Sequence, residues 1–201
     1  MAAPTHVFFD IGGVLGTNGW DTEQRASAAA EFGLDGEFEA RHREIAGDWE
    51  LGRLSADEYL DIAVFYEPRP FSRETFFEWM KRQSRPFEES VALARKLADA
   101  GKVSLFTLNN ESAELNQHRI EAFGLAPIFD AFFSSCWLGV RKPTPRIYTV
   151  ALAAAQAPPA DSLFIDDRAQ NLGPAAARGM RTILYRDPAQ LEAALAREGL
   201  L

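Results

Sequence analysis

The sequence predicts an α/β protein with a Rossmann-like parallel sheet of five strands, flanked by helices, and with a small helical bundle inserted after the first strand. Three observations predict this fold class. Val7 to Phe9 form a short, wholly apolar run, as a strand buried on both faces requires. A stretch with few strand signals follows, over about residues 21–85. From there on, apolar runs alternate with helical patterns, which is typical of a parallel sheet with crossover helices.

The first predicted strand ends at a carboxylate. Asp10 directly follows the apolar run, and Gly12 and Gly13 indicate that the backbone turns sharply there. The carboxyl end of a central parallel strand is where open α/β sheets bind ligands, so Asp10 is a candidate site residue. From this segment alone, a structural role for Asp10 in a turn or a helix cap is an equal alternative.

The insert after the first strand is expected to form a bundle of four helices. Asp21 can cap the first helix, Ser55 and Glu58 have the spacing of a capping box, and Ser72 can cap the last helix. Apolar and aromatic residues recur at helical spacing, which favours a bundle core over a ligand cage. The residues expected in this core are Phe38, Ile45, Tyr59, Ile62, Ala63, Tyr66, Phe76, Phe77 and Trp79.

The remainder of the chain is expected to alternate strand and helix. Strands are predicted over 103–108, 129–138, 162–165 and 182–185, and helices over 86–100, 112–123, 145–156, 172–178 and 188–195. The length of 201 residues suits one domain with a small insertion. We therefore predict an α/β core made of residues 1–17 and 86–201, and a helical cap made of residues 18–85.

Composition narrows the classes of partner. The formal net charge is −8 and no basic stripe occurs, which argues against binding to nucleic acid or to an anionic membrane. Cys136 is the only cysteine, so an internal disulfide and a thiolate metal cluster are excluded, and we expect it to pack in the core. No membrane-spanning run and no signal peptide are recognised, and we expect a soluble, cytoplasmic protein.

Polar side chains follow four of the predicted strands, and a parallel sheet would bring them to one edge. They are Asp10 after the first strand, Thr107, Asn109 and Asn110 at the second, Lys142 after the third, and Asp166 and Asp167 after the fourth. Taken singly, each residue could instead have a structural role, as a turn residue, a helix cap or a solvent-exposed lysine. Their occurrence at four successive strand ends predicts that they meet in one crevice.

The chemistry of this set indicates phosphoryl transfer. Three neighbouring carboxylates raise one another's pKa unless a cation lies between them, and few, hard oxygen ligands suit Mg²⁺. Lys142 can hold a phosphate or neutralise an aspartate, and an aspartate can attack phosphorus to form an aspartyl-phosphate. The residues therefore predict a Mg²⁺-dependent site for a small phosphate ester, with catalysis mainly by positioning and charge neutralisation.

The same residues resemble the motifs of the haloacid dehalogenase-like hydrolases, over essentially the full length of the chain. Phe-Phe-Asp10-Ile-Gly-Gly-Val-Leu is similar to the first motif, and Leu-Phe-Thr107-Leu-Asn109-Asn110 to the second. Lys142-Pro-Thr-Pro-Arg-Ile-Tyr148 resembles the lysine motif of the phosphatase branches, and Phe-Ile-Asp166-Asp167-Arg-Ala-Gln-Asn171 the acidic motif. The helical insert is similar to the small cap of that family.

The resemblance implies a role for each of these residues. Asp10 would be the nucleophile and also a metal ligand. The other metal ligands would be the backbone carbonyl of Gly12 and the carboxylate of Asp167, and Asp166 would bind either the metal or a water molecule. Lys142 would steady both nucleophile and phosphate. The phosphate would be bound by Thr107, Asn109, Asn110 and Lys142.

Two departures from the family pattern bear on activity. Most phosphatases of the family carry an aspartate at the position of Gly12, which protonates the leaving group and later activates water; glycine can do neither. We expect slow turnover or dependence on a substrate with a good leaving group. A metal-bound water or a polar neighbour could take the acid–base role, and Thr17, Asn18 and Asp21 are candidates by their proximity in sequence. In the second motif, Leu108 stands where a small hydroxyl residue usually precedes the Asn, so either Thr107 is shifted into that role or backbone amides and Asn109 bind the phosphate.

Three functions follow from the sequence, of which a Mg²⁺-dependent phosphatase acting on a sugar phosphate or similar metabolite is the leading one. The alternatives are a metal-independent 2-haloacid dehalogenase and a phosphate-ligand-binding protein weakened in catalysis by Gly12. The cap is expected to select the substrate, while its Trp20, Arg41, His42, Arg43 and Trp49 are expected at the surface rather than in the pocket.

Overall fold

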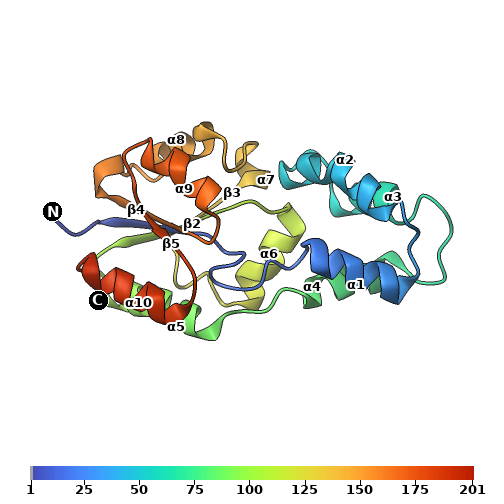
Figure 1. The fold of residues 1–201 in the computed structure, drawn as a ribbon, viewed down its shortest axis with the longest axis horizontal. Coiled ribbons are helices and arrows are strands. Elements are labelled where there is room, and N and C mark those ends of the chain that lie inside the picture. The colour runs from blue at the N-terminus through green and yellow to red at the C-terminus, as the bar shows by residue number, and fades with distance from the viewer. Residues whose placement is uncertain (1) are drawn as a thin grey trace.

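The computed structural model describes residues 2–201 as a five-stranded parallel sheet with helices on both faces and a separate lobe of helices beyond the carboxyl ends of the strands (Figure 1). The strands are β1 (His6–Phe9), β2 (Ser104–Asn109), β3 (Ala131–Ser134), β4 (Ser162–Asp166) and β5 (Arg181–Leu184). Their order is β3-β2-β1-β4-β5, and all neighbouring pairs are parallel. The predicted fold class is confirmed, because β1 is central and the strands alternate with crossover helices.

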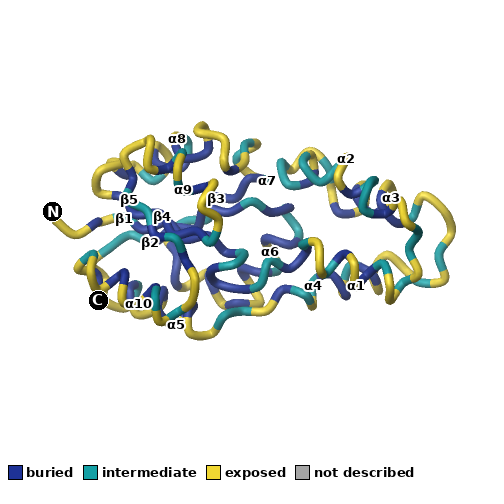
Figure 2. Tube along the Cα trace, in the orientation of Figure 1, coloured by how far each residue is buried: buried dark blue, intermediate teal, exposed yellow. Residues whose placement is uncertain are grey.

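Side-chain alternation divides the sheet into two buried faces (Figure 2). On one face, Val7 and Phe9 pack with apolar residues of α5 (Glu88–Ala100) and α10 (Pro188–Arg197). On the other, Phe8 packs with residues of α8 (Pro145–Ala154) and α9 (Ala169–Ala176). Because β1 is apolar and fully buried from Val7 to Phe9, it suits this place between two layers of helices.

The lobe that follows β1 consists of α1 (Thr22–Phe32), α2 (Phe38–Glu50), α3 (Ala56–Ala63) and α4 (Arg73–Arg82). The expected caps are present: Asp21 accepts a hydrogen bond from Thr22 N, Ser55 and Glu58 form a capping box, and Ser72 accepts from Thr75 N. These side chains satisfy backbone donors that the first helical turn leaves free. We refer to residues 18–85 as the helical lobe.

Two core predictions for the lobe are wrong. Ile62 is 41% exposed, and Tyr66 is 47% exposed. Helix α3 ends at Ala63, so Tyr66 lies outside the helical repeat from which its burial was predicted. Its hydroxyl instead donates to Asp35, and the Arg41 guanidinium lies over its ring. The buried residues of the lobe form a separate cluster that includes Phe38, Tyr59, Phe76 and Trp79.

The third predicted strand is too long. Strand β3 ends at Ser134, and residues Ser135–Leu138 form the short helix α7. The pairing explains the difference, because Ser134 pairs with Asn109, the last residue of β2, and no partner backbone continues beyond it. Cys136 therefore lies on α7 and is only half-buried, rather than packed in the core.

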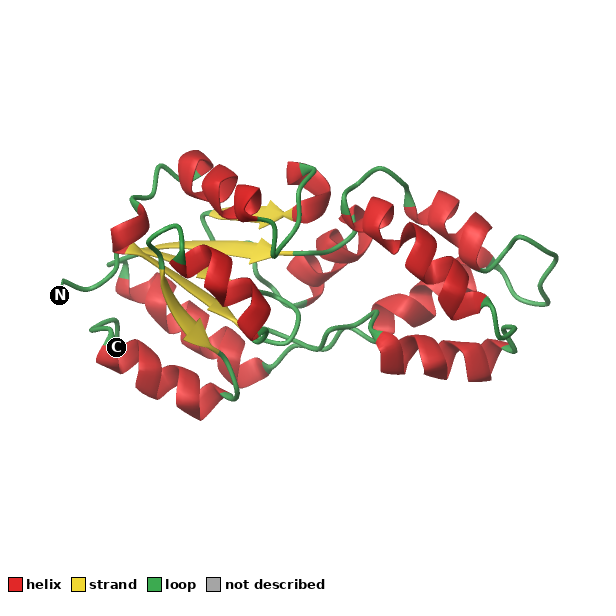
Figure 3. Cartoon of the chain, turned by 45° about the horizontal axis from the view of Figure 1, so that its top comes forward, coloured by secondary structure: helices red, strands yellow, loops and turns green. Residues whose placement is uncertain are grey.

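Two segments join the lobe to the sheet and run side by side (Figure 3). Gly16 and Pro86 form an antiparallel bridge, Thr17 N donates to Arg85 O, and Arg85 N donates to the Thr17 hydroxyl. A second contact lies at the other end of the lobe, where the Ser135 hydroxyl donates to Glu50 O at 2.6 Å. Among residues 2–201, no helix has the length and apolar character to cross a bilayer. The division at residues 18 and 85 stays a prediction.

Candidate active site

Three carboxylates meet where β1 and β4 end. Asp10 follows β1, Asp166 is the last residue of β4, and Asp10 N donates to Ile165 O at 2.9 Å, which fixes the two strand ends against each other. One carboxylate oxygen from each of Asp10, Asp166 and Asp167 lies within 4.8 Å of the other two. The parallel register therefore places these residues together, as expected from the sequence.

Gly13 makes the approach of Asp167 possible. The glycine has a φ of +77°, and a Cβ added to it would lie 2.3 Å from Asp167 Oδ2. A larger residue would therefore clash with the carboxylate as well as strain the backbone. The loop after β1 can pass this close to the end of β4 only because glycine stands at position 13.

Lys142 lies between two of the carboxylates. Its Nζ is 2.9 Å from Asp10 Oδ2 and 2.7 Å from Asp166 Oδ2, and the side chain is buried. Asn110 fixes the backbone of this lysine, since its Nδ2 donates to Lys142 O at 2.9 Å and its Oδ1 accepts from Lys142 N at 2.8 Å. Asn171 Nδ2 lies 3.0 Å from both oxygens of Asp166 and so orients that carboxylate.

Burial and like charge set the protonation of this group. Burial raises the pKa of Asp10, Lys142 opposes that rise, and Asp166 adds to it. Burial also raises the pKa of Asp167, with a further contribution from Asp166. Burial by itself would lower the pKa of the Lys142 ammonium, but Asp10 and Asp166 outweigh it and raise that pKa. The site thus carries more negative charge than one lysine neutralises.

The carboxylates fit a bound Mg²⁺. Asp167 Oδ1 is buried and has no hydrogen-bond partner among residues 2–201. A buried carboxylate oxygen without a partner is costly, and a cation among three carboxylates removes that cost. Oxygen ligands in this small number are the set that Mg²⁺ prefers, since it keeps waters and takes substrate oxygens as well.

A cavity of about 410 Å³ opens over Asp10 between the sheet and the helical lobe. Lys142 and Asn110 line it, and so do Asn18 and Asp21, two of the three residues considered as replacements for the missing acid–base group. The third, Thr17, does not line it, because its hydroxyl donates to Gln83 O and accepts from Arg85 N. Five basic side chains line this cavity: Arg25, Arg119, Arg141, Lys142 and Arg168.

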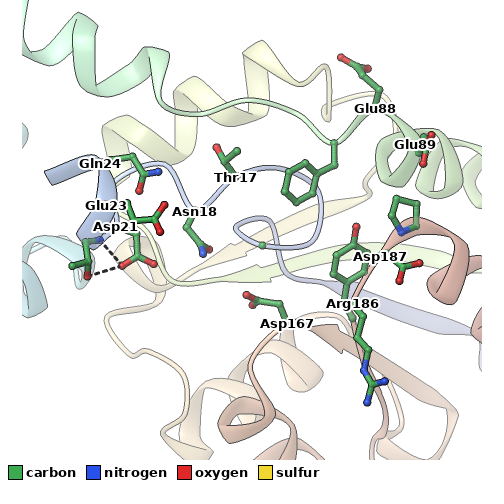
Figure 4. Close-up of a pocket in the computed structure, with 15 residues that line it drawn as sticks. Thr17, Asn18, Asp21, Glu23, Gln24, Glu88, Glu89, Asp167, Arg186 and Asp187 are labelled. Atoms are coloured by element: carbon green, nitrogen blue, oxygen red, sulfur yellow. Dashed lines mark hydrogen bonds between the residues drawn. The ribbon is translucent and has the colours of Figure 1, made fainter. Parts of the chain in front are cut away.

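A larger cavity of about 1080 Å³ lies on the other side of the loop that follows β1 (Figure 4). Asp167 lines it, but Asp10 and Lys142 do not. Acidic side chains surround it, with Glu23, Glu88 and Asp187 among them. The nucleophile candidate and the lysine therefore belong to the smaller cavity, and Asp167 borders the larger one.

The second motif is arranged differently from the expectation for phosphate binding. Thr107 is fully buried in β2 and does not line the cavity over Asp10, and its hydroxyl has no partner among residues 2–201. Leu108 packs on the opposite face of the sheet. Asn109 is also buried, and its Nδ2 donates to Asn116 Oδ1 at 2.8 Å. Of the residues at this strand end, Asn110 and Glu111 line the cavity.

Three lobe residues expected at the surface are buried instead. Trp20 Nε1 donates to the Tyr59 hydroxyl, which lies 2.8 Å from His42 Nδ1, and the Trp49 ring stacks on Tyr59 at 4.0 Å. Trp20, His42 and Trp49 also line the cavity. The surface prediction failed because Trp20 and His42 contact the Tyr59 hydroxyl inside the lobe, while the Trp49 ring stacks on Tyr59 and its buried Nε1 has no hydrogen-bond partner among residues 2–201. Arg43 is exposed as expected, and Arg41 is half-buried on Asp35.

The sequence interpretation missed Arg119 and Glu111, which form a buried ion pair at 2.8 Å on the cavity wall. A signal was present. Arg119 stands four residues after Leu115 in α6 (Ala113–Ala122), on the stripe that faces the protein interior, and an arginine there needs an acidic partner.

Comparison with known proteins agrees with this architecture. A family model described as haloacid dehalogenase-like hydrolase matches residues 4–179. The chain is 34% identical over 128 residues to bifunctional epoxide hydrolase 2 of Rattus norvegicus, an alignment that covers 61% of this chain and 23% of that protein. It is 26% identical over 164 residues to flavin mononucleotide hydrolase 1 of Arabidopsis thaliana, covering 81% of this chain and 65% of that protein. The chain thus spans about a quarter of the epoxide hydrolase.

A solved structure shares the fold over nearly its full length. It is a HAD family enzyme from Bacteroides thetaiotaomicron in complex with magnesium and inorganic phosphate, with a TM-score of 0.78 and 20% identity. The superposition covers 91% of this chain and 94% of that one. At this level of identity, the likeness establishes the common fold.

Proposed function

The chain belongs to the haloacid dehalogenase-like hydrolases, and on this premise we propose that it is a Mg²⁺-dependent phosphatase acting on a small phosphorylated metabolite. One observation carries the proposal: the carboxylates of Asp10, Asp166 and Asp167 and the ammonium of Lys142 form a single cluster, in which all but Asp167 are buried. Magnesium and phosphate bound to the Bacteroides enzyme, and the hydrolysis of a phosphate ester named for the Arabidopsis relative, support it.

Asp10 is the proposed nucleophile. One of its carboxylate oxygens attacks the phosphorus, the bond from phosphorus to the leaving oxygen breaks, and an aspartyl-phosphate forms. Water then releases inorganic phosphate and restores the carboxylate. Lys142, 2.9 Å from Asp10, holds the carboxylate in place and stabilises negative charge on the phosphoryl oxygens.

Asp10, Asp166, Asp167 and the carbonyl of Gly12 are the proposed holders of Mg²⁺. When bound, the ion supplies positive charge that neutralises the phosphoryl group. Asn110 and Lys142 are the proposed phosphate-binding residues, because both line the cavity. Thr107 and Asn109 are buried and do not line the cavity, so we assign them to the support of this strand end.

The helical lobe is the proposed cap, extending over residues 18–85. Its Trp20, Arg25, His42 and Trp49 form the wall of the cavity opposite the sheet. A lobe in this place would shield the reacting groups from water and contact the alcohol part of the substrate.

The test is phosphate release from p-nitrophenyl phosphate by the purified chain with Mg²⁺. We expect release that EDTA abolishes and that Asp10→Asn reduces by roughly 1,000-fold or more, since the nucleophile is then lost. Release that persists in Asp10→Asn would exclude the aspartyl-phosphate.

The same preparation tests the two alternatives. Halide release from 2-chloropropionate in EDTA would indicate a dehalogenase. A failure to hydrolyse a broad panel of phosphate esters, combined with thermal stabilisation by one of them, would indicate a binding protein.

A further inference from the structure

Arg119 occupies the space beside Gly12, two residues after the proposed nucleophile. Its Nη1 lies 3.2 Å from the point where a Cβ on Gly12 would stand, and Asn18 Oδ1 lies 3.1 Å from that point. Gly12 and Arg119 both line the cavity over Asp10. Where most phosphatases of the family would have an acid–base aspartate, this chain therefore has a guanidinium supplied by α6.

The guanidinium is held firmly, but one of its nitrogens is free. Arg119 Nε donates to the Ser84 hydroxyl at 3.2 Å, and Nη2 donates to Asn18 O and lies 2.8 Å from Glu111 Oε2. Only 2% of Arg119 is exposed. Nη1 makes no hydrogen bond to any of residues 2–201. A fixed guanidinium, paired with Glu111 through Nη2, thus presents the unpaired N–H groups of Nη1 to the cavity that Asp10 also lines.

An arginine here can stabilise charge but cannot supply a proton, because it keeps its proton at any physiological pH. During attack by Asp10, the leaving oxygen takes the electron pair of the breaking phosphorus–oxygen bond. With glycine at position 12, no side chain there protonates that oxygen. A leaving group that departs as an anion needs no proton from this position, and a buried guanidinium beside it stabilises the developing charge.

Resting on the proposed function, we propose that the substrate is a diphosphate whose terminal phosphoryl group is transferred to Asp10 while Arg119 binds the departing phosphate. An oxygen of Asp10 bonds to the terminal phosphorus, and the bond from that phosphorus to the bridging oxygen breaks. The bridging oxygen keeps the electron pair and leaves on the other phosphate, which is stable as an anion without protonation. The other arginines on the cavity wall are paired with carboxylates, Arg25 with Glu39, Arg141 with Glu50 and Arg168 with Asp21, so the donor on which the proposal rests is Nη1 of Arg119.

The first experiment uses the unmodified chain with Mg²⁺ and three probes: inorganic pyrophosphate, p-nitrophenyl phosphate and glycerol 1-phosphate. We expect kcat/KM for pyrophosphate to exceed that for glycerol 1-phosphate by roughly 100-fold or more, the usual contribution of a positioned acid that only the alkoxide leaving group needs. Equal or faster hydrolysis of glycerol 1-phosphate would overturn the proposal.

The second experiment removes the guanidinium without leaving an unpaired buried carboxylate. We compare the double variant Arg119→Gln/Glu111→Gln with Glu111→Gln, so that only the guanidinium differs, and use Arg95→Gln on the exposed face of α5 as an arginine control. Loss of Arg119 should lower pyrophosphate hydrolysis by roughly 100-fold, as for removal of one donor to a developing anion. Hydrolysis of p-nitrophenyl phosphate should fall by much less.

A purely structural role for Arg119 would lower the rates on both probes by the same factor, and that outcome would also overturn the proposal. Failure of the proposed function looks different, because then none of the probes is hydrolysed or the activity survives Asp10→Asn. A third outcome is activity on p-nitrophenyl phosphate that requires Asp10 but shows no preference for pyrophosphate. This result would support the proposed phosphatase function and would overturn only the proposal of a diphosphate substrate.

Discussion

The ammonium of Lys142 lies 2.9 Å from Asp10 and is the one basic group within salt-bridge distance of that carboxylate among residues 2–201. Replacing it by Met should lower kcat on p-nitrophenyl phosphate by about 100-fold or more, because a positioned charge at the phosphoryl group is lost. The unfolding free energy in EDTA should fall by about 3–5 kcal/mol, since the buried carboxylates of Asp10 and Asp166 lose the cation that they share. Urea unfolding and steady-state kinetics measure the two effects.

Lys96→Met is the matched control, because Lys96 is exposed and meets Glu192 only at 3.4 Å. It should change stability by less than about 1 kcal/mol and leave kcat unchanged. Equal kinetics in the two variants would contradict the position that we give Lys142.

Asp167 should couple Mg²⁺ to folding. Its unpartnered Oδ1 and the raised pKa of its carboxyl both indicate a group that a cation stabilises. Titration of the wild type with Mg²⁺ should raise the thermal midpoint, and Asp167→Asn should abolish most of that rise. In EDTA, the variant should be as stable as the wild type or more stable, because one of three crowded carboxylates has become neutral.

The control for this experiment is Asp99→Asn, at an exposed position of α5. It should keep the full stabilisation by Mg²⁺. A midpoint that does not respond to Mg²⁺ in the wild type would argue against a metal at the three carboxylates.

His42 should make stability depend on pH. Burial lowers its pKa to about 4, helped by Arg25 and Arg43 and opposed by Glu39 and Asp21. The pKa of histidine in the unfolded chain is about 6.5. Between about pH 6.5 and about pH 4, the unfolded state therefore binds a proton at His42 that the folded state does not bind. The unfolding free energy should therefore fall as the pH drops from about 6.5 to about 4, by on the order of 1 kcal/mol or more, and this term should stop changing below that range.

His42→Asn removes the titrating ring and leaves a side-chain oxygen that can accept from the Tyr59 hydroxyl. Denaturant unfolding between pH 4 and pH 7.5 should show a shallower pH dependence for this variant than for the wild type. Parallel curves would show that His42 is protonated equally in both states.

The sequence predicted the fold class because its signals are local. An apolar run such as Val7 to Phe9, a capping box at Ser55 and Glu58, and strand–helix alternation after residue 86 each specify their own element. The convergence of Asp10, Lys142, Asp166 and Asp167 follows once the strands are parallel. Their chemical roles stay predictions, since geometry alone does not establish them.

The contacts that sequence reasoning missed depend on how distant elements pack. Trp20 and His42 are far apart in the chain, and only the folded lobe joins them through Tyr59. Arg119 reaches Asn18 across 101 positions of sequence. The length of β3 likewise depends on where its partner strand β2 ends. The sequence of residues 129–138 alone contains no information about that end.

The position of Arg119 leads to a result opposite to the one that the family pattern suggests for Gly12→Asp. By resemblance alone, this substitution would restore an acid–base group and raise the rate on alkyl phosphates. In this structure, the new Cβ would stand 3.2 Å from the free Nη1, so we expect its carboxylate to form an ion pair with the guanidinium, which would lower its pKa and make it a poor acid. It would also neutralise the guanidinium that we assign to the leaving phosphate.

We therefore expect Gly12→Asp to lower kcat/KM for pyrophosphate by at least about tenfold, because a like charge now faces the leaving group, and to raise glycerol 1-phosphate hydrolysis little. Gly12→Ala is the control, since the backbone at this position lies outside the left-handed region and its nearest neighbours are the far ends of Asn18 and Arg119. It should retain most of the pyrophosphate activity. A large increase in kcat/KM for glycerol 1-phosphate in Gly12→Asp would mean that the new aspartate acts as an acid despite Arg119. It would contradict the role that we give the guanidinium beside the leaving group.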